Sequence, residues 1–146
     1  MFENHMELRF ASISQNEALA RTVAAAFATQ LNPTIEELTD IRTAVSEAVT
    51  NAIIHGYEND PLGMVCMTCH IEGENITIQV EDAGRGIADV ALARQPFYTT
   101  QPEMERSGMG FSVMEAFMDG VEVESSPGQG TKVTMRKQLH LGENNG

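Results

Sequence analysis

The sequence predicts an α/β domain, because segments with strand-like alternation are interleaved with segments of helical periodicity. Alternating segments at 64–71 and 76–81 flank a short turn and indicate a β-hairpin, and segments at 121–125 and 131–137 indicate a second one. Upstream, between residues 14 and 55, two apolar stripes recur at helical spacing. The 146 residues, of which 42% are hydrophobic, suffice for a single domain with its own core.

The first expected elements are a short strand over 7–11 and a helix over 14–30. Ser14 and Glu17 have the S-x-x-E spacing of a capping box, which predicts the start of the helix. Arg21 lies off the apolar stripe, so it is either a solvated surface charge or a contact for a protein partner. The stripe itself consists of Leu19, Val23, Ala26, Phe27 and Leu31.

The second helix is expected to begin at Pro33, with Asn32 as its N-cap, and to end near His55, before Gly56. Its length and spacing predict one broad face buried in the core. That face consists of Ile35, Leu38, Ile41, Val45, Val49, Ala52 and Ile53.

Glu47 and Asn51 are four residues apart near the end of this helix, so they share one face beside the apolar stripe. A carboxylate can act as a base and a carboxamide oxygen can bind a metal ion, which suits metal-assisted phosphate chemistry. The same spacing also occurs on solvated helix faces. The pair therefore needs support from the rest of the chain.

Asp82 ends the first hairpin and is followed by Gly84 and Gly86. Glycines allow the backbone to approach a ligand closely and to adopt positive φ. A carboxylate at this place can accept a hydrogen bond from an exocyclic amine such as that of adenine. The D-x-G-x-G pattern also serves as a tight turn, so both interpretations stay open here.

A further glycine pair, Gly108-x-Gly110, leads into an amphipathic helix expected at 111–118. Free N–H groups and the helix dipole at such a start favour an anion, and Arg106 just upstream adds positive charge. Residues 89–106 are expected to form a short helix, to about residue 94, and then a long connection. Long connections inside compact domains are often lids or binding segments.

Charge and composition exclude some classes of function for this chain. The net charge of -12 argues against direct binding of nucleic acid and fits either solubility or a basic protein partner. The sequence shows neither a membrane-spanning apolar run nor a secretory signal. Cys66 and Cys69 fall on opposite faces of a strand, which favours inert thiols over a redox or zinc pair, and we therefore expect a reducing, cytoplasmic setting. Residues 138–146 are expected to form a polar, flexible tail.

Four motifs follow one another in a set order, and the ordered set is far more specific than any single motif. They are Glu47-x-x-x-Asn51 on a helix, Asp82-x-Gly84-x-Gly86 after a strand, Gly108-x-Gly110 before a helix, and Gly128-x-Gly130-Thr131 in a late hairpin. Over residues 7–137 the set resembles the N, G1, G2 and G3 boxes of the ATP-binding fold shared by gyrase, Hsp90, histidine kinases and MutL. The resemblance implies one ATP-binding domain over 1–146. Its expected fold is a two-layer α/β sandwich, with a mostly antiparallel mixed sheet and helices packed on one face.

The resemblance also implies roles for individual residues. Asn51 is expected to hold Mg²⁺ bridged to the nucleotide phosphates, and Glu47 to act as the general base. Asp82 is expected to read adenine with Thr131 beside it, and Arg106 to stabilise charge on the γ-phosphate. The other implied nucleotide-binding positions are Gly84, Gly86, Ser107, Gly108, Met109 and Gly110.

A free-standing module of this kind resembles the anti-sigma-factor serine kinases. Three stretches, 46–57, 93–96 and 105–111, are similar specifically to the anti-sigma-F factors of endospore-forming bacteria. The resemblance implies a homodimer that binds ATP or ADP with Mg²⁺, inhibits an RNA polymerase sigma factor and phosphorylates a serine of an anti-anti-sigma antagonist. Three alternatives stay open: the equivalent kinase for a stress-response sigma factor, a non-catalytic ATP-binding module that acts by sequestration, and an ATPase that transfers phosphate to water.

Overall fold

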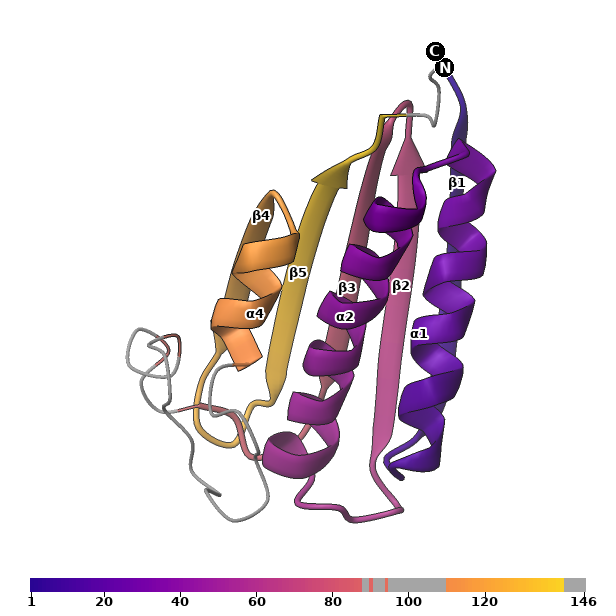
Figure 1. The fold of residues 1–146 in the computed structure, drawn as a ribbon. Coiled ribbons are helices and arrows are strands. Elements are labelled where there is room, and N and C mark those ends of the chain that lie inside the picture. Colours follow the sequence, from indigo (N-terminus) through magenta and orange to yellow (C-terminus); the bar gives the residue numbers. More distant parts are fainter. Residues whose placement is uncertain (88–89, 91–93, 95–109, 141–146) are drawn as a thin grey trace.

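A five-stranded sheet with the order β1-β2-β3-β5-β4 carries the helices α1, α2 and α4 on one face (Figure 1). This two-layer arrangement is the one that the resemblance implied, and each strand pairing in the described part of the chain is antiparallel. The computed structural model describes residues 1–87, 90, 94 and 110–140. No helix within these residues has the length and apolar character needed to cross a membrane.

Both predicted hairpins, β2–β3 and β4–β5, are confirmed, and β1 begins earlier than predicted. The helical region after α1 contains a 3₁₀ turn, η1, and α2 ends in a π-helical turn, η2. The strands are β1 (Glu3–Ala11), β2 (Met64–Glu72), β3 (Asn75–Asp82), β4 (Gly120–Ser125) and β5 (Thr131–Gln138). The helical elements are α1 (Gln15–Ala28), η1 (Thr29–Leu31), α2 (Ile35–Asn51), η2 (Ala52–Gly56) and α4 (Gly110–Phe117).

Alternate strand residues face the helices and form the core, as the period-two pattern requires. Met67 of β2 and Val80 of β3 are register partners, and both are buried on this side. Cys69 is buried and Cys66 is partly exposed on the other face, and both thiols are free. Burial raises the pKa of the Cys69 thiol to about 12, so this thiol is unreactive at neutral pH.

The buried face of α1 differs from the predicted stripe. Leu19 is 47% exposed, and on α2 the first stripe residue, Ile35, is 83% exposed. Periodicity weights large apolar residues above alanine, but small residues allow two helices to pack closely. The buried residues of α1 are Ala20, Ala24, Phe27 and Ala28.

Thr34, not Asn32, is the N-cap of α2. The Thr34 hydroxyl accepts the Glu37 N–H at 3.1 Å, and the Glu37 carboxylate accepts the Thr34 N–H at 3.0 Å. This reciprocal pair is a capping box. Asn32 instead follows η1 with a φ of 51°, a left-handed conformation that asparagine tolerates. The capping box predicted at Ser14 is wrong, because Ser14 makes no side-chain cap hydrogen bond.

The chain beyond β5 is anchored, which corrects the predicted tail for its first residues. Leu139 is fully buried, and its N–H donates to the Glu74 carbonyl at 2.9 Å. The His140 N–H donates to Glu37 Oε2 at 3.0 Å, and His140 Nδ1 lies 2.5 Å from the same atom. Burial alone would raise the pKa of the Glu37 carboxyl, but the bonds from His140 and Thr34 lower this pKa overall. Residues 141–146 lie outside the described residues.

We expect Leu139→Ala to lower the free energy of unfolding by roughly 2–4 kcal/mol, because it removes a buried side chain and leaves a cavity. Denaturant titration of the purified protein measures this change. Leu62 is 90% exposed, so Leu62→Ala is a matched control that should shift stability by less than about 0.5 kcal/mol. Equal, small effects of the two substitutions would mean that Leu139 belongs to a frayed tail.

Candidate functional site

Asp82, the last residue of β3, is one of two buried acidic residues in the described chain; the other is Glu37. Burial raises the pKa of the Asp82 carboxyl to about 6, and backbone N–H groups of Gly84 and Thr131 oppose this rise. The Gly84 N–H lies 2.9 Å from Oδ1. A buried carboxylate with a perturbed pKa at a strand end is typical of a ligand-binding group.

Gly56 and Gly84 allow two chain segments to meet beside Asp82. A Cβ atom on Gly84 would lie 2.0 Å from the Gly56 carbonyl oxygen, and one on Gly56 would lie 2.7 Å from the Asp82 carboxyl. The Arg85 N–H donates to the Gly56 carbonyl at 2.9 Å. Gly84 therefore lies beside Asp82, whereas sequence reasoning treated Gly56 only as a helix stop and missed its contact with Asp82.

Tyr57 ties the end of α2 to the segment after Asp82. Its hydroxyl accepts the Ala83 N–H at 2.7 Å and donates to the Met64 carbonyl at 2.8 Å. A Cβ atom on Gly63 would lie 2.5 Å from the Tyr57 ring, so the ring packs directly on that backbone. Sequence reasoning missed this role of Tyr57. The signal for it in the sequence is its position directly after Gly56.

Gly86 lies against the backbone of the β4–β5 hairpin. Its φ of 76° lies in the left-handed region that favours glycine, and a Cβ there would lie 2.0 Å from the Ser126 carbonyl oxygen. The Gly128 N–H donates to the Arg85 carbonyl at 2.7 Å. The Arg85 guanidinium also pairs with Glu58 at 2.5 Å. The D-x-G-x-G segment is therefore held between the loop after η2 and the hairpin.

Ser125, which sequence reasoning missed, joins this segment to Thr131. Its Oγ accepts the Ile87 N–H at 2.8 Å, lies 2.9 Å from the Gly130 carbonyl oxygen and 2.8 Å from Thr131 Oγ1. Ser125, Thr131 and Asp82 are register partners across β4, β5 and β3. The predicted neighbourhood of Thr131 and Asp82 is therefore observed. A lone serine at a strand end gives no sequence pattern that could have revealed Ser125.

Asn51, the last residue of α2, lies beside Gly110, the first residue of α4. A Cβ atom on Gly110 would lie 3.0 Å from Asn51 Nδ2. This Nδ2 atom is buried and has no hydrogen-bond partner among the described residues. Buried polar atoms without partners are costly and rare, and this N–H donor could bond an acceptor of a ligand, such as a phosphate oxygen. Glu47 is partly exposed one turn earlier on the same helix.

The Asn51 carboxamide fits an Mg²⁺ ion that is shared with phosphates. Carboxamide oxygens are hard ligands, and Mg²⁺ usually takes one or two protein ligands together with phosphates and water. Within the described residues no group of three or more His, Cys, Asp and Glu side chains could hold a metal ion. Phosphates and water can supply the other ligands of an ion bound by the Asn51 carboxamide oxygen.

The remaining predicted residues lie either on another part of the fold or outside the described residues. Arg21 lies on α1, the helix farthest from α4 (Figure 1), and pairs with Glu17 at 3.5 Å. In the predicted helix at 89–94 the structure describes Val90 and Arg94, and the Arg94 N–H donates to the Val90 carbonyl at 3.1 Å. The positions outside the described residues are Arg106, Ser107, Gly108 and Met109.

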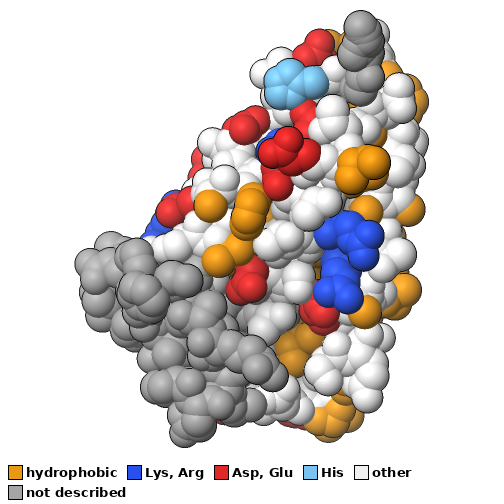
Figure 2. Space-filling view, in the orientation of Figure 1, with side chains coloured by type: hydrophobic (Ala, Val, Ile, Leu, Met, Phe, Trp, Pro, Cys, Tyr) orange, Lys and Arg blue, Asp and Glu red, His pale blue; other side chains and the backbone are white. Residues whose placement is uncertain are grey.

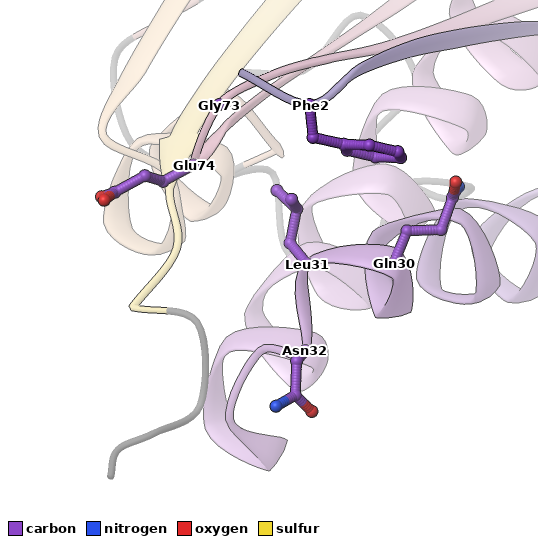
Figure 3. A pocket seen from close by; sticks show the side chains of 6 residues that line it. All are labelled: Phe2, Gln30, Leu31, Asn32, Gly73 and Glu74. Atoms are coloured by element: carbon purple, nitrogen blue, oxygen red, sulfur yellow. The ribbon is translucent and has the colours of Figure 1, made fainter. Parts of the chain in front are cut away.

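An open pocket of 420 Å³ lies at a different place, where the start of β1, η1 and the β2–β3 turn meet (Figure 3). The side chains of Phe2 and Leu31 point into it, whereas those of Asn32 and Glu74 point away. Its lining contains none of the residues that surround Asp82 or Asn51. This pocket is therefore separate from the candidate site.

Two solved structures share the fold at low sequence identity. The RsbU and RsbW domains of Rv1364c from Mycobacterium tuberculosis superpose with a TM-score of 0.66 and 18% identity, over 93% of this chain and 32% of that chain. Full-length ShkA in complex with AMPPNP superposes with a TM-score of 0.56 and 21% identity, over 86% of this chain and 30% of that chain. Both likenesses support the two-layer fold.

Sequence comparison identifies the family. The family model of the histidine kinase-like ATPase domain matches residues 10–137. An anti-sigma F factor of Thermoanaerobacter sp. (strain X514) is 60% identical over 138 residues, 94% of this chain and 96% of the relative. An anti-sigma F factor of Oceanobacillus iheyensis is 56% identical over 137 residues, 94% of each chain. The chain therefore belongs to the histidine kinase-like ATPase domain family and, within it, to the anti-sigma F factors.

Proposed function

We propose that the chain is an ATP-dependent protein-serine kinase that also acts as an anti-sigma factor. It binds and inhibits a sporulation sigma factor of RNA polymerase and phosphorylates a serine of the anti-anti-sigma antagonist. The observation that carries the proposal is the position of Glu47 and Asn51 on α2, at the end that leads through Gly56 to Asp82. The name of the relatives, anti-sigma F factor, supports the choice of partner.

In the proposed site, Asp82 accepts a hydrogen bond from the exocyclic amine of adenine, with Thr131 beside it. The carboxamide of Asn51 binds Mg²⁺, which when present neutralises phosphate charge and orients the γ-phosphate. The N–H groups at the start of α4, from Gly110, face phosphate oxygens. Arg106 stabilises negative charge on the γ-phosphate. The remaining proposed nucleotide-binding residues are Gly84 and Gly86 in the pocket floor, together with Ser107, Gly108 and Met109.

Glu47 supplies the base for transfer. As the hydroxyl oxygen of the substrate serine attacks the γ-phosphorus of ATP, its proton moves to the Glu47 carboxylate. The bond between the γ-phosphorus and the β–γ bridging oxygen breaks, ADP leaves, and the serine becomes a phosphoserine. A module that only stored nucleotide would need no carboxylate at this place.

The proposed partners are proteins, and the chain works as a homodimer in the cytoplasm. A net charge of -12 suits a basic segment of a sigma factor rather than nucleic acid. Figure 2 shows acidic side chains spread over the helix-bearing face and one basic patch over α1 and α2. These helices carry one arginine each, Arg21 and Arg42. Arg21 is accordingly a proposed contact for a protein partner.

Radiolabelled ATP, incubated with the chain and an anti-anti-sigma protein, tests the kinase proposal. We expect label on a serine of the antagonist, and Glu47→Ala should slow this transfer by roughly 10²-fold to 10⁴-fold while nucleotide still binds. Glu36→Ala is the matched control, because Glu36 is exposed in the first turn of the same helix.

Three results would contradict parts of this proposal. Unchanged single-turnover transfer by Glu47→Ala would exclude Glu47 as the base. Label recovered only as free phosphate would favour an ATPase, and no label release would favour a sequestration module. Co-purification with a sporulation or a stress-response sigma factor separates the two kinase alternatives.

Asn51→Ala should weaken the binding of Mg-ATP about tenfold or more, because it removes one oxygen ligand of a charged group. Titration calorimetry with and without Mg²⁺ measures the effect, which should be small when the metal is absent. Asn75→Ala, at an exposed asparagine of β3, is the control and should bind normally. Native affinity of Asn51→Ala for Mg-ATP would contradict the proposed metal ligand.

Nucleotide affinity should fall as the pH drops through about 6, the raised pKa of Asp82, because the protonated carboxyl no longer accepts a hydrogen bond from adenine at full strength.

The contribution of Asp82 to the free energy of unfolding should change with pH in the opposite sense. The folded state holds the Asp82 proton more tightly than the unfolded state, so this group stabilises the fold at low pH and less as the pH rises through 6.

Binding measured between pH 5 and pH 8 should therefore differ between the native chain and Asp82→Asn, which cannot titrate at this position. Subtraction of the Asp82→Asn profile removes the titration of the nucleotide phosphates. Parallel pH profiles for the two proteins would show that Asp82 does not contact the base.

A further inference from the structure

Ser125, Thr131 and Asp82 form one polar row across β4, β5 and β3. They are register partners, so their side chains project from the same face of the sheet. The row continues the buried face of the sheet, because Val80 and Val133, two residues further along, are also partners and are buried. The three side chains therefore lie side by side on the helix-bearing face, at the end where Gly56 contacts Asp82.

The hydrogen bonds of Ser125 determine which way its proton points. A serine hydroxyl carries one proton and two acceptor lone pairs. The Ile87 N–H can only donate to Oγ, at 2.8 Å, and the Gly130 carbonyl can only accept from it, at 2.9 Å. The single Ser125 proton is thus directed to Gly130. In the third contact, at 2.8 Å, Thr131 Oγ1 must then be the donor.

With its proton directed to Ser125, the Thr131 hydroxyl can offer only its lone pairs to a further partner. The Asp82 carboxylate is likewise an acceptor, and the N–H groups of Gly84 and Thr131 donate to it. Both side chains at this end of the row therefore present acceptors. At position 6 of a purine, an exocyclic amine offers two N–H donors that match them, whereas a carbonyl oxygen at that position leaves acceptors facing each other.

Resting on the nucleotide-binding function proposed above, we propose that Ser125 is a positioning residue that fixes the Thr131 hydroxyl as an acceptor. It thereby makes the pocket select adenine nucleotides over nucleotides of hypoxanthine, which carry a carbonyl in place of the amine. Without the Ser125 hydroxyl, the Thr131 hydroxyl is free to rotate and to donate to that carbonyl.

The test compares the dissociation constants of ATP and ITP for the full chain by titration calorimetry. In Ser125→Ala the ITP-to-ATP ratio of these constants should fall by roughly threefold to tenfold, the value of about one net hydrogen bond, chiefly through tighter ITP binding. Ser125→Thr keeps the hydroxyl and should keep the native ratio. An unchanged ratio in Ser125→Ala would overturn the proposal while ATP binding, and with it the proposed function, still stands.

Thr131→Val provides an independent arm, because it removes the acceptor and leaves the bonds of Ser125 to Ile87 and Gly130 in place. This substitution must lower the same ratio, and it carries the test if thermal unfolding shows that Ser125→Ala does not fold. When Ser125→Ala is added to Thr131→Val, the ITP-to-ATP ratio should not fall further. If the two substitutions lower the ratio additively, Ser125 acts without Thr131, and the proposal is overturned. Failure of the native chain to bind either nucleotide would overturn the proposed function itself.

Discussion

The site depends on the burial of one carboxylate, that of Asp82. An ionised group away from water is costly unless nearby donors compensate, and the rise of the pKa of Asp82 to about 6 reflects that cost. The donors come from Gly84 and from Thr131, so the turn after β3 and the β3–β5 pairing must both be in place. The carboxylate therefore links the local turn to the long-range order of the sheet.

Helix α2 carries two further proposed functional groups, Glu47 and Asn51, and both of its ends are fixed to the sheet layer. At its start, Glu37 caps the helix and holds His140 after β5. At its end, the Gly56 carbonyl accepts the Arg85 N–H, and Tyr57 holds Ala83. A helix held at both ends cannot slide along the sheet. These contacts help to set the positions of Glu47 and Asn51 relative to Asp82.

The hairpins and most of the α2 stripe could be predicted because one buried face imposes a period that the sequence displays. Leu19 and Ile35 were misassigned because periodicity does not show that alanines form the closer helix contact or that a first turn is exposed. The tail was misplaced because the bond from His140 to Glu37 joins residues far apart in the chain. Of the predicted site, Asp82, Gly84, Gly86 and Thr131 lie together, and Asn51 lies beside Gly110. Tyr57 and Ser125 act through long-range hydrogen bonds, which produce no periodic pattern in the sequence.

This contrast has a physical cause. Where a Cβ atom would lie 2.0 Å from a carbonyl oxygen, as at Gly84 and Gly86, glycine is the one residue that fits, so the constraint is visible in the sequence. A hydrogen-bonding centre such as Ser125 needs only one hydroxyl of the right reach, which more than one residue type offers. Glycine spacing therefore identifies the fold, because it records where backbones meet. The polarity that selects a ligand resides in groups such as Ser125 and Thr131, and it emerges only when their donors and acceptors are counted in three dimensions.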